Sequence, residues 1–309
     1  MKRSDIYNKV NSVIKDKLAS GSLPWRKTWN NGKPPQNFIS KHLYQGINFL
    51  LLSCFDFPSP FYLTFLQAKE RNAYIKKGEK GIPIVFWKLL DNTKIKESGK
   101  AEIDKIPFMR TSTVFNLSQT SLYNSAALED LKFPNVEKFL ATVPAVIKNN
   151  IQGKAVFNLT KDFISIPAIS EFESSDEYYS TLFHELIHWT GFKNRLNRFK
   201  SADYNSDNYS KEELIAEIGS AYLCSYFGIN NTLDNSAGYI QGWLNSLNND
   251  QSIFISAAAQ AKNAVNYLIK DFEESAEQDP VNTSERETFF NAEAENAEDL
   301  EPGFVMEHR

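Results

Sequence analysis

The segment His184-Glu185-Leu186-Ile187-His188 has the residue types and spacing of a hydrolytic metal site. Apolar side chains recur around it at helical spacing: Tyr179, Leu182, Phe183, Leu186 and Ile187. On a helix, residues i and i+4 stand one above the other, so His184 and His188 can present two imidazoles to one metal ion. Zinc would lower the pKa of a bound water and polarise a carbonyl, and Glu185, next to the first ligand, could take the proton. The motif therefore predicts a zinc site of the metallopeptidase type on one helix.

A chance pair of core histidines is the plainer alternative. The chain has only four histidines, His42, His184, His188 and His308. Two of these four stand at the required spacing on a credible helix, with glutamate at the required position between them. A metal site is the better explanation of that coincidence.

The third protein ligand must come from elsewhere, because a catalytic zinc ion takes three ligands and keeps one position open. In one class of zinc peptidases the motif continues as HExxHxxGxxH and its last histidine is the third ligand. Here Gly191 matches, but Asn194 stands in place of that histidine, which excludes this class of peptidase. In the other class a following helix supplies a glutamate, and Glu213 and Glu217 share one face of a helix predicted over 211–226. We expect Glu213 to be the third ligand and Glu217 to orient a ligand imidazole. The reverse assignment stays open.

Glu213 also has a simpler explanation, because Ser210-x-x-Glu213 fits a helix capping box. A cap worth about 1 kcal/mol would explain one acid at this place. It would not explain Glu217 one turn later on the same face. The neighbouring Glu212 is expected to face solvent.

Composition excludes several classes of protein. The only cysteines, Cys54 and Cys224, lie far apart, which rules out a disulfide framework and a cysteine-rich zinc module. The first ten residues lack the apolar stretch of a signal peptide, and no apolar run is long enough to span a bilayer. We therefore expect a cytoplasmic protein with no membrane partner.

Charge is distributed unevenly along the 309 residues, whose net charge is −4. Residues 1–125 carry 20 Lys/Arg against 9 Asp/Glu, residues 126–270 carry 12 against 16, and residues 271–309 carry 2 against 13. Such asymmetry predicts a front end that binds a polyanion and an acidic tail.

Aromatic and cationic residues are interleaved in the basic front end. The candidates for DNA binding are Trp25, Arg26, Lys27, Trp29, Lys76, Lys77, Lys80 and Trp87. Cations can follow the phosphates while rings stack on unpaired bases, so this mixture suits single-stranded DNA. No helix-turn-helix or zinc-finger pattern is present to read a duplex. An ordinary domain with a solvated basic face and buried tryptophans is the alternative.

Periodicity predicts an α+β protein. Helices are expected over 6–18, 48–54 and 63–72, and strands over 82–87 and 111–117 with a loop or loose hairpin between them. A connecting helix is expected within 126–150, followed by strands over 155–159 and 163–166 and by helices over 179–189, 211–226, 237–247 and 253–272. The expected units are a mixed α/β basic domain (1–125), a connecting segment (126–150), a mainly helical domain with a small sheet (151–272) and a disordered acidic tail (273–309).

The chain apart from its tail resembles the ArdC-type antirestriction proteins of plasmids and other mobile elements. The front-end resemblance rests on Leu23-Pro24-Trp25, Gln45-Gly46-Ile47-Asn48, Lys77-Gly78-Glu79-Lys80-Gly81 and Val114-Phe115-Asn116-Leu117. The rear resemblance rests on residues 181–191, Arg195-Leu196 and Glu212-Glu213-Leu214-Ile215-Ala216-Glu217. It implies an N-terminal domain that binds single-stranded DNA, a zincin-like metallopeptidase domain, and protection of incoming DNA from restriction. In zincins with this second-helix pattern the first acid binds the metal and the last supports a histidine, which Glu213 and Glu217 match.

The resemblance leaves two functions open, and a third interpretation is a peptidase whose basic domain recruits an acidic protein or restrains the acidic tail of the same chain. One is a DNA-associated zinc peptidase that acts on a protein partner, such as a restriction component, with residues 163–166 as the edge strand for an extended peptide. The other is a protein that shields single-stranded DNA and whose zinc site is structural or vestigial.

Overall fold

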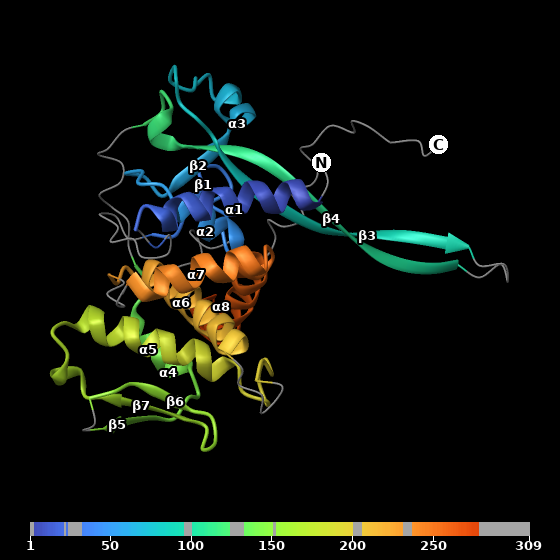
Figure 1. The fold of residues 1–309 in the computed structure, drawn as a ribbon. Helices are drawn as coiled ribbons and strands as arrows, with labels where there is room; N and C mark the ends of the chain where they lie inside the picture. Colours follow the sequence, from blue (N-terminus) through green and yellow to red (C-terminus); the bar gives the residue numbers. More distant parts are fainter. Residues whose placement is uncertain are drawn as a thin grey trace.

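The computed structural model describes residues 3–21, 23, 33–95, 101–123, 133–150, 153–199, 206–230 and 237–277, with the backbone alone for 87–95, 101–108, 206–209, 237–240 and 276–277. The first half of this part holds α1 (Arg3–Ala19), β1 (Gln36–Asn37), α2 (Ile47–Ser53), β2 (Phe61–Thr64), α3 (Phe65–Glu70), β3 (Ile82–Ile95) and β4 (Ala101–Asn116). The second half holds α4 (Val136–Thr142), β5 (Ile147–Asn150), β6 (Val156–Asn158), β7 (Phe163–Pro167), α5 (Ser175–Thr190), α6 (Ser206–Phe227), α7 (Ala237–Asn249) and α8 (Ile253–Glu277). The chain is therefore α+β, as the sequence predicted (Figure 1). None of the described helices is long and apolar enough to cross a membrane.

The strands of the first half form a sheet in the order β1-β2-β4-β3, in which β1 and β2 are parallel and the other pairs antiparallel. Helix α3 starts where β2 ends, through a reciprocal cap between Thr64 and Gln67. Thr64 Oγ1 accepts from Gln67 N at 3.2 Å, and Gln67 Oε1 accepts from Thr64 N at 2.9 Å. This cap explains why α3 begins at Phe65, after the start of the helix predicted over 63–72.

Strands β3 and β4 form a long hairpin that projects from the body of the protein (Figure 1). Their pairing runs from Ile82 opposite Val114 to Ile95 opposite Ala101. The sequence predicted regular strands only near the base of this hairpin. Main-chain pairing in a two-stranded ribbon does not require alternating apolar residues, and that alternation was the signal used for the prediction.

The second half packs a small sheet, in the order β5-β7-β6, against α5 (Figure 1). Strand β5 is parallel to β7, and β6 is antiparallel to it. The expectation that residues 163–166 form an edge strand is therefore wrong, because β7 is the central strand and β6 is an edge. Strand β5 was not predicted, because its four residues, Ile147 to Asn150, are polar or largely exposed and show no apolar pattern.

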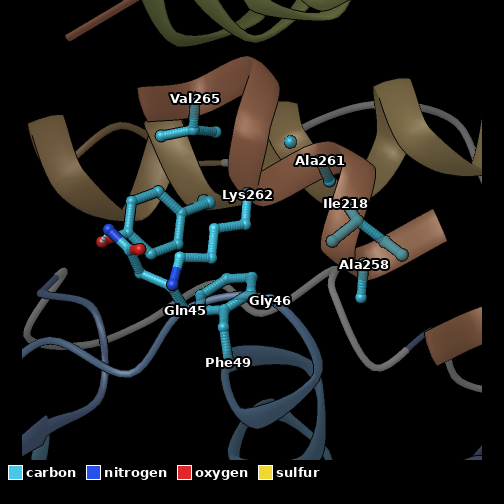
Figure 2. A pocket seen from close by; sticks show the side chains of 10 residues that line it. Gln45, Gly46, Phe49, Ile218, Ala258, Ala261, Lys262 and Val265 are labelled. Carbon is cyan, nitrogen blue, oxygen red and sulfur yellow. Dashed lines mark hydrogen bonds between the residues drawn. The ribbon is translucent and has the colours of Figure 1, made fainter. Parts of the chain in front are cut away.

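One hydrophobic cluster contains buried residues from both halves of the protein. Helix α1 contributes Ile6, Val10, Ile14 and Leu18, and the helices α5, α6 and α8 contribute most of the rest. At the junction, Gln45, Gly46 and Phe49 face residues of α6 and α8 around a small pocket (Figure 2). Gly46 has a φ of 57°, and a Cβ there would lie 3.4 Å from the carbonyl oxygen of Ala258, so a glycine lets the chain pass close to α8.

Candidate metal centre

Helix α5 carries both histidines of the motif. Ser174 caps its first turn, its Oγ accepting from Glu177 N at 3.2 Å, and Asp176 and Glu177 suit the positive end of the helix dipole. Its apolar face is buried through Leu182, Phe183, Leu186 and Ile187. His184 and His188 lie one turn apart, with ring centroids separated by 4.7 Å. The predicted helix is confirmed, and its cap places its start a few residues earlier than expected.

Helix α6 crosses α5 closely enough to bring Glu213 to the histidines. The close approach occurs at Gly219, where a Cβ would lie 2.7 Å from Ile187 Cδ1 and 2.8 Å from its Cγ1. Ser220 Oγ also donates to the carbonyl oxygen of Ser180 at 2.9 Å, in a buried bond between the two helices. Small residues on α6 thus set the separation of the two helices that carry the site.

At the start of α6 the structure excludes the alternative explanation of Glu213 and contradicts the expectation for Glu212. The helix begins at Ser206, so Ser210 lies within it and does not cap it in front of Glu213. Glu212 does not face solvent, because it is 9% exposed and lies against His188. Without the cap, the position of Glu213 is explained by the histidines that it faces.

The side chains of His184, His188 and Glu213 converge. Each offers one potential ligand atom, and these atoms all lie within 4.8 Å of one another. The two Nε2 atoms are 3.1 Å apart. Glu213 Oε2 lies 3.4 Å from His184 Nε2, and its Oε1 lies 3.5 Å from His188 Nε2. The structure therefore brings together the two histidines and the favoured glutamate.

These separations and donor types fit a divalent metal ion. Metal–ligand bonds of about 2.0–2.2 Å in a tetrahedral arrangement place neighbouring ligand atoms roughly 3.3 Å apart. Imidazole nitrogen and carboxylate oxygen are donors that zinc and other first-row divalent ions accept. Three protein ligands also leave a coordination position for water or substrate.

His184 is surrounded by carboxylates. Burial by itself lowers the pKa of an imidazole, but the hydrogen bond to Glu213 and the charges of Glu217, Glu185 and Glu213 together raise the pKa of His184 to about 9. Such an excess of negative charge is what a bound cation would offset. His184 Nδ1 is buried and has no hydrogen-bond partner within the described part of the chain. The charge of Glu217, the residue expected to orient an imidazole, is one of those that raise the pKa of His184.

His188 has a carboxylate partner of its own on α6. Its Nδ1 lies 3.3 Å from Glu212 Oε1. Arg198 holds the same carboxylate, with Nη2 at 2.7 Å from Oε1 and Nε at 3.0 Å from Oε2. Burial acts to raise the pKa of Glu212, but the bonds to His188 and Arg198 outweigh it and lower that pKa below its usual range.

Glu185 faces the edge of the small sheet. Its carboxylate is buried, with the residue 8% exposed, and its Oε2 accepts a hydrogen bond from Phe157 N at 2.6 Å. Phe157 lies in β6, and because this N–H is given to Glu185 it takes no part in the pairing with β7. The main chain of β6 thus holds Glu185 beside the histidines.

Comparison with known proteins places this geometry in a family. Residues 4–115 match the family model of the N-terminal domain of anti-restriction factor ArdC, and residues 134–260 match that of a zincin-like metallopeptidase. The metal-free crystal structure of the antirestriction ArdC protein from plasmid R388 is 33% identical, with a TM-score of 0.74, and the match covers 87% of this chain and 98% of that chain. The chain belongs to the ArdC antirestriction family. The family resemblance predicted from the sequence is confirmed.

Other relatives of this ArdC-family chain extend the comparison. The Mn(II)-bound structure of the R388 protein aligns with a TM-score of 0.70 and 33% identity over 86% of this chain and 97% of that one. Two proteins named DNA primase TraC, from Escherichia coli, are each 31% identical over 86% of this chain, which spans only 27% and 20% of their lengths. The protein y4eC from Sinorhizobium fredii is 28% identical over 86% of this chain and 92% of its own length.

The structure places only part of the predicted DNA-binding set in the ArdC N-terminal domain. Trp25, Arg26, Lys27 and Trp29 lie outside the described residues, and Trp87 is described only by its backbone, in β3. The DNA-binding role of these five residues therefore remains a prediction.

The lysine cluster of the same domain is described and exposed. Lys76, Lys77 and Lys80 lie in the turn that precedes β3. Lys76 Nζ lies 6.0 Å from the ring centroid of Tyr123, and Tyr74 is 67% exposed. Two tyrosines therefore accompany the predicted cations on this part of the surface.

Sequence reasoning missed three groups that contact the residues of the candidate metal centre. These are the second carboxylate Glu212, its partner Arg198, and the main-chain N–H of Phe157. The presence of two adjacent acids at 212 and 213 was a signal for a second role. Arg198 and Phe157 gave no local signal, because their contacts depend on the path of a loop and of a strand.

Proposed function

We propose that this protein is an antirestriction protein of a mobile genetic element that binds single-stranded DNA and carries a zinc-dependent metallopeptidase site. The observation that carries the peptidase assignment is the convergence of His184, His188 and Glu213, whose ligand atoms lie within 4.8 Å of one another next to Glu185. These three residues would hold the ion.

The chemistry proposed for this site is hydrolysis of a peptide bond. Zinc, when bound, would supply Lewis acidity that polarises a carbonyl and acidifies water. Glu185 would take a proton from the attacking water and return it to the leaving amine as the C–N bond breaks. The hydrogen bond from Phe157 N at 2.6 Å supports this role, because it fixes the position of the base.

An extended peptide substrate would lie along β6. This strand pairs with β7 on one side only, and its other side faces Glu185 through Phe157. Peptides often bind by adding a strand to such an edge, where main-chain hydrogen bonds supply affinity. Strand β6 therefore takes the substrate-binding role that the sequence had assigned to residues 163–166.

DNA binding is assigned to the N-terminal domain. We call Tyr74, Lys76, Lys77, Lys80 and Tyr123 the Tyr–Lys surface. Its cations would contact phosphates and its rings would stack on unpaired bases. The same role is proposed for Trp25, Arg26, Lys27, Trp29 and Trp87.

The proposed domain division puts DNA binding in residues 1–125 and peptide hydrolysis in residues 151–272, joined by residues 126–150. Strand β5 lies in this joining segment and pairs with β7, so the segment also contributes to the sheet of the peptidase domain. The proposed setting is the cytoplasm, where incoming DNA meets restriction enzymes.

The test compares two variants of the full chain in a host with an active restriction system. Glu185→Gln should abolish cleavage of a protein substrate and protection of incoming DNA, while binding to single-stranded DNA is retained. Full protection by Glu185→Gln, together with loss of protection after charge reversal of Lys76, Lys77 and Lys80, would instead identify a DNA-shielding protein with a non-catalytic metal site.

A further inference from the structure

We propose that Glu212 and Arg198 are positioning residues of the metal centre: Glu212 fixes the ring of His188, and Arg198 fixes Glu212. This inference rests on the proposed metal site and deepens it. It assigns roles to two residues that coordinate nothing themselves and lie on different segments of the chain.

The first link is the contact between Glu212 and His188. Glu212 Oε1 lies 3.3 Å from His188 Nδ1, while His188 Nε2 faces His184 and Glu213 at 3.1 Å and 3.5 Å. A neutral imidazole that donates from Nδ1 carries its lone pair on Nε2. Glu212 therefore selects the tautomer of His188 that can coordinate an ion, and it holds the ring in the plane that the ion requires.

The second link is the hydrogen-bonded ion pair between Arg198 and Glu212. Nη2 lies 2.7 Å from Oε1 and Nε lies 3.0 Å from Oε2, so the guanidinium contacts both carboxylate oxygens. The two side chains are 6% and 11% exposed, which excludes most of the competing water. Hydrogen bonds to both oxygens fix the orientation of the carboxylate as well as its position.

Arg198 is itself anchored to the end of the histidine helix. Nη1 donates to Thr190 Oγ1 at 2.8 Å, and Nη2 donates to the carbonyl oxygen of Ile187 at 2.6 Å. That carbonyl belongs to the last turn of α5, where main-chain acceptors lack helical partners. One guanidinium thus joins α5 to the acid on α6.

Gly191 leaves room for the side chain of Arg198. A Cβ at this position would lie 2.9 Å from Arg198 Nη2 and 2.6 Å from Phe199 Cε2. Asn194, which stands where related motifs have a third histidine, is exposed. In this protein, Gly191 therefore lets the side chain of Arg198 come close to the end of α5. The loop after α5 brings an arginine to the site in place of a third histidine ligand.

Arg195 provides a matched control in the same loop. Its side chain is 8% exposed and pairs with Asp162, in the turn between β6 and β7, with Nη1 at 3.0 Å from Oδ2. Its guanidinium carbon also lies 3.9 Å from the ring centroid of Trp189. Arg195 is thus a buried, ion-paired arginine that anchors the loop to the sheet rather than to Glu212.

The experiment measures zinc affinity of the full-length protein by competition with a chromophoric chelator. Glu212→Gln, Arg198→Lys and Gly191→Ala should each weaken zinc binding by about 10- to 100-fold, the usual effect of losing a group that orients a ligand. Arg195→Lys should leave zinc affinity unchanged. Zinc affinity in Glu212→Gln equal to that of the unmodified protein would overturn the inference.

A second readout separates positioning from general stability. The visible absorption spectrum of the Co(II)-loaded protein reports the geometry around the ion, and it should change in Glu212→Gln and not in Arg195→Lys. Equal losses of zinc affinity in Arg195→Lys and Arg198→Lys would contradict the proposed chain of contacts. Failure of the unmodified protein to bind zinc would overturn the proposed function itself, so the two failures are distinguishable.

Discussion

The main-chain N–H of Phe157 donates a hydrogen bond of 2.6 Å to the carboxylate of Glu185, which joins the edge strand β6 to the histidine helix. The acid proposed as general base is therefore held by the same strand that is proposed to bind the substrate. A shift of β6 would move the base and the docking edge together. This coupling would give the small sheet a direct part in the proposed chemistry of the site.

Replacement of Glu185 by glutamine should separate catalysis from folding. The amide oxygen can still accept from Phe157 N, so Glu185→Gln should fold and bind zinc as the unmodified protein does. Loss of the base should lower the rate of peptide cleavage by about 10²- to 10⁴-fold. The check is the turnover of a cleavable protein substrate alongside zinc content, and cleavage at the unmodified rate would contradict the assigned role.

The third ligand can be identified by comparing two glutamates of α6. Glu213 lies 3.4 Å and 3.5 Å from the two histidine Nε2 atoms, and the charge of Glu217 is one of several that raise the pKa of His184. Glu213→Gln should therefore weaken zinc binding more than Glu217→Gln, whose effect should stay near the 10- to 100-fold loss typical of groups behind the ligands. Isothermal titration with zinc measures both, and a larger loss in Glu217→Gln would reverse the assignment.

The close crossing of α5 and α6 makes Gly219 sensitive to substitution. A Cβ at 2.7 Å from Ile187 Cδ1 requires the helices to separate or the isoleucine to shift. Gly219→Ala should lower the free energy of unfolding by about 1–3 kcal/mol, and it should weaken zinc binding because Glu213 moves away from the histidines.

The matched control for that variant is Gly242→Ala. Gly242 lies in α7, and a Cβ there would have no heavy atom within 4 Å. Alanine is a better helix former than glycine by up to about 1 kcal/mol, so this variant should be as stable as the unmodified protein or more so. Chemical denaturation measures both. Equal stability of the two variants would show that the crossing is not tight at Gly219.

The lysines of the Tyr–Lys surface should account for part of the affinity for single-stranded DNA. Changing Lys76, Lys77 and Lys80 together to glutamate should weaken DNA binding and reduce the slope of log affinity against log salt by roughly 2, since each lost phosphate contact contributes about 0.7. Fluorescence anisotropy at several salt concentrations is the measurement.

The control for this charge reversal places the same change within residues 134–260, which match the zincin-like model. Lys138, Lys148 and Lys154 are exposed there, and their replacement by glutamate changes the net charge equally. This variant should keep most of its affinity and its salt slope. An equal loss in both triple variants would show that overall charge, rather than the Tyr–Lys surface, determines binding.

The parts of the site that the sequence predicted are those governed by local geometry. His184 and His188 are one helical turn apart, and a helix places them together whatever the rest of the chain does. Glu213 required one further step, a second helix packed against the first. Arg198 could not be predicted, because its contact with Glu212 depends on how the loop after α5 folds back over Gly191.

In the fold, too, the elements governed by local sequence pattern were predicted and those that depend on distant contacts were not. Helices with a buried apolar face, such as α1 and α5, were predicted close to their observed bounds. Strand β5 and the outer part of the β3–β4 hairpin were not predicted as strands, because main-chain pairing holds them and their sequences carry no apolar alternation. The position of β7 in the middle of its sheet follows from the pairing of β5, so its misassignment as an edge had the same cause.

The most direct test of the account is anomalous diffraction at the zinc edge from crystals of the full-length protein grown with zinc. The account predicts one strong peak per chain at about 2.0–2.2 Å from the Nε2 atoms of His184 and His188 and from a carboxylate oxygen of Glu213. A zinc-loaded crystal with no peak at these three residues, or with the peak at another set of side chains, would contradict it.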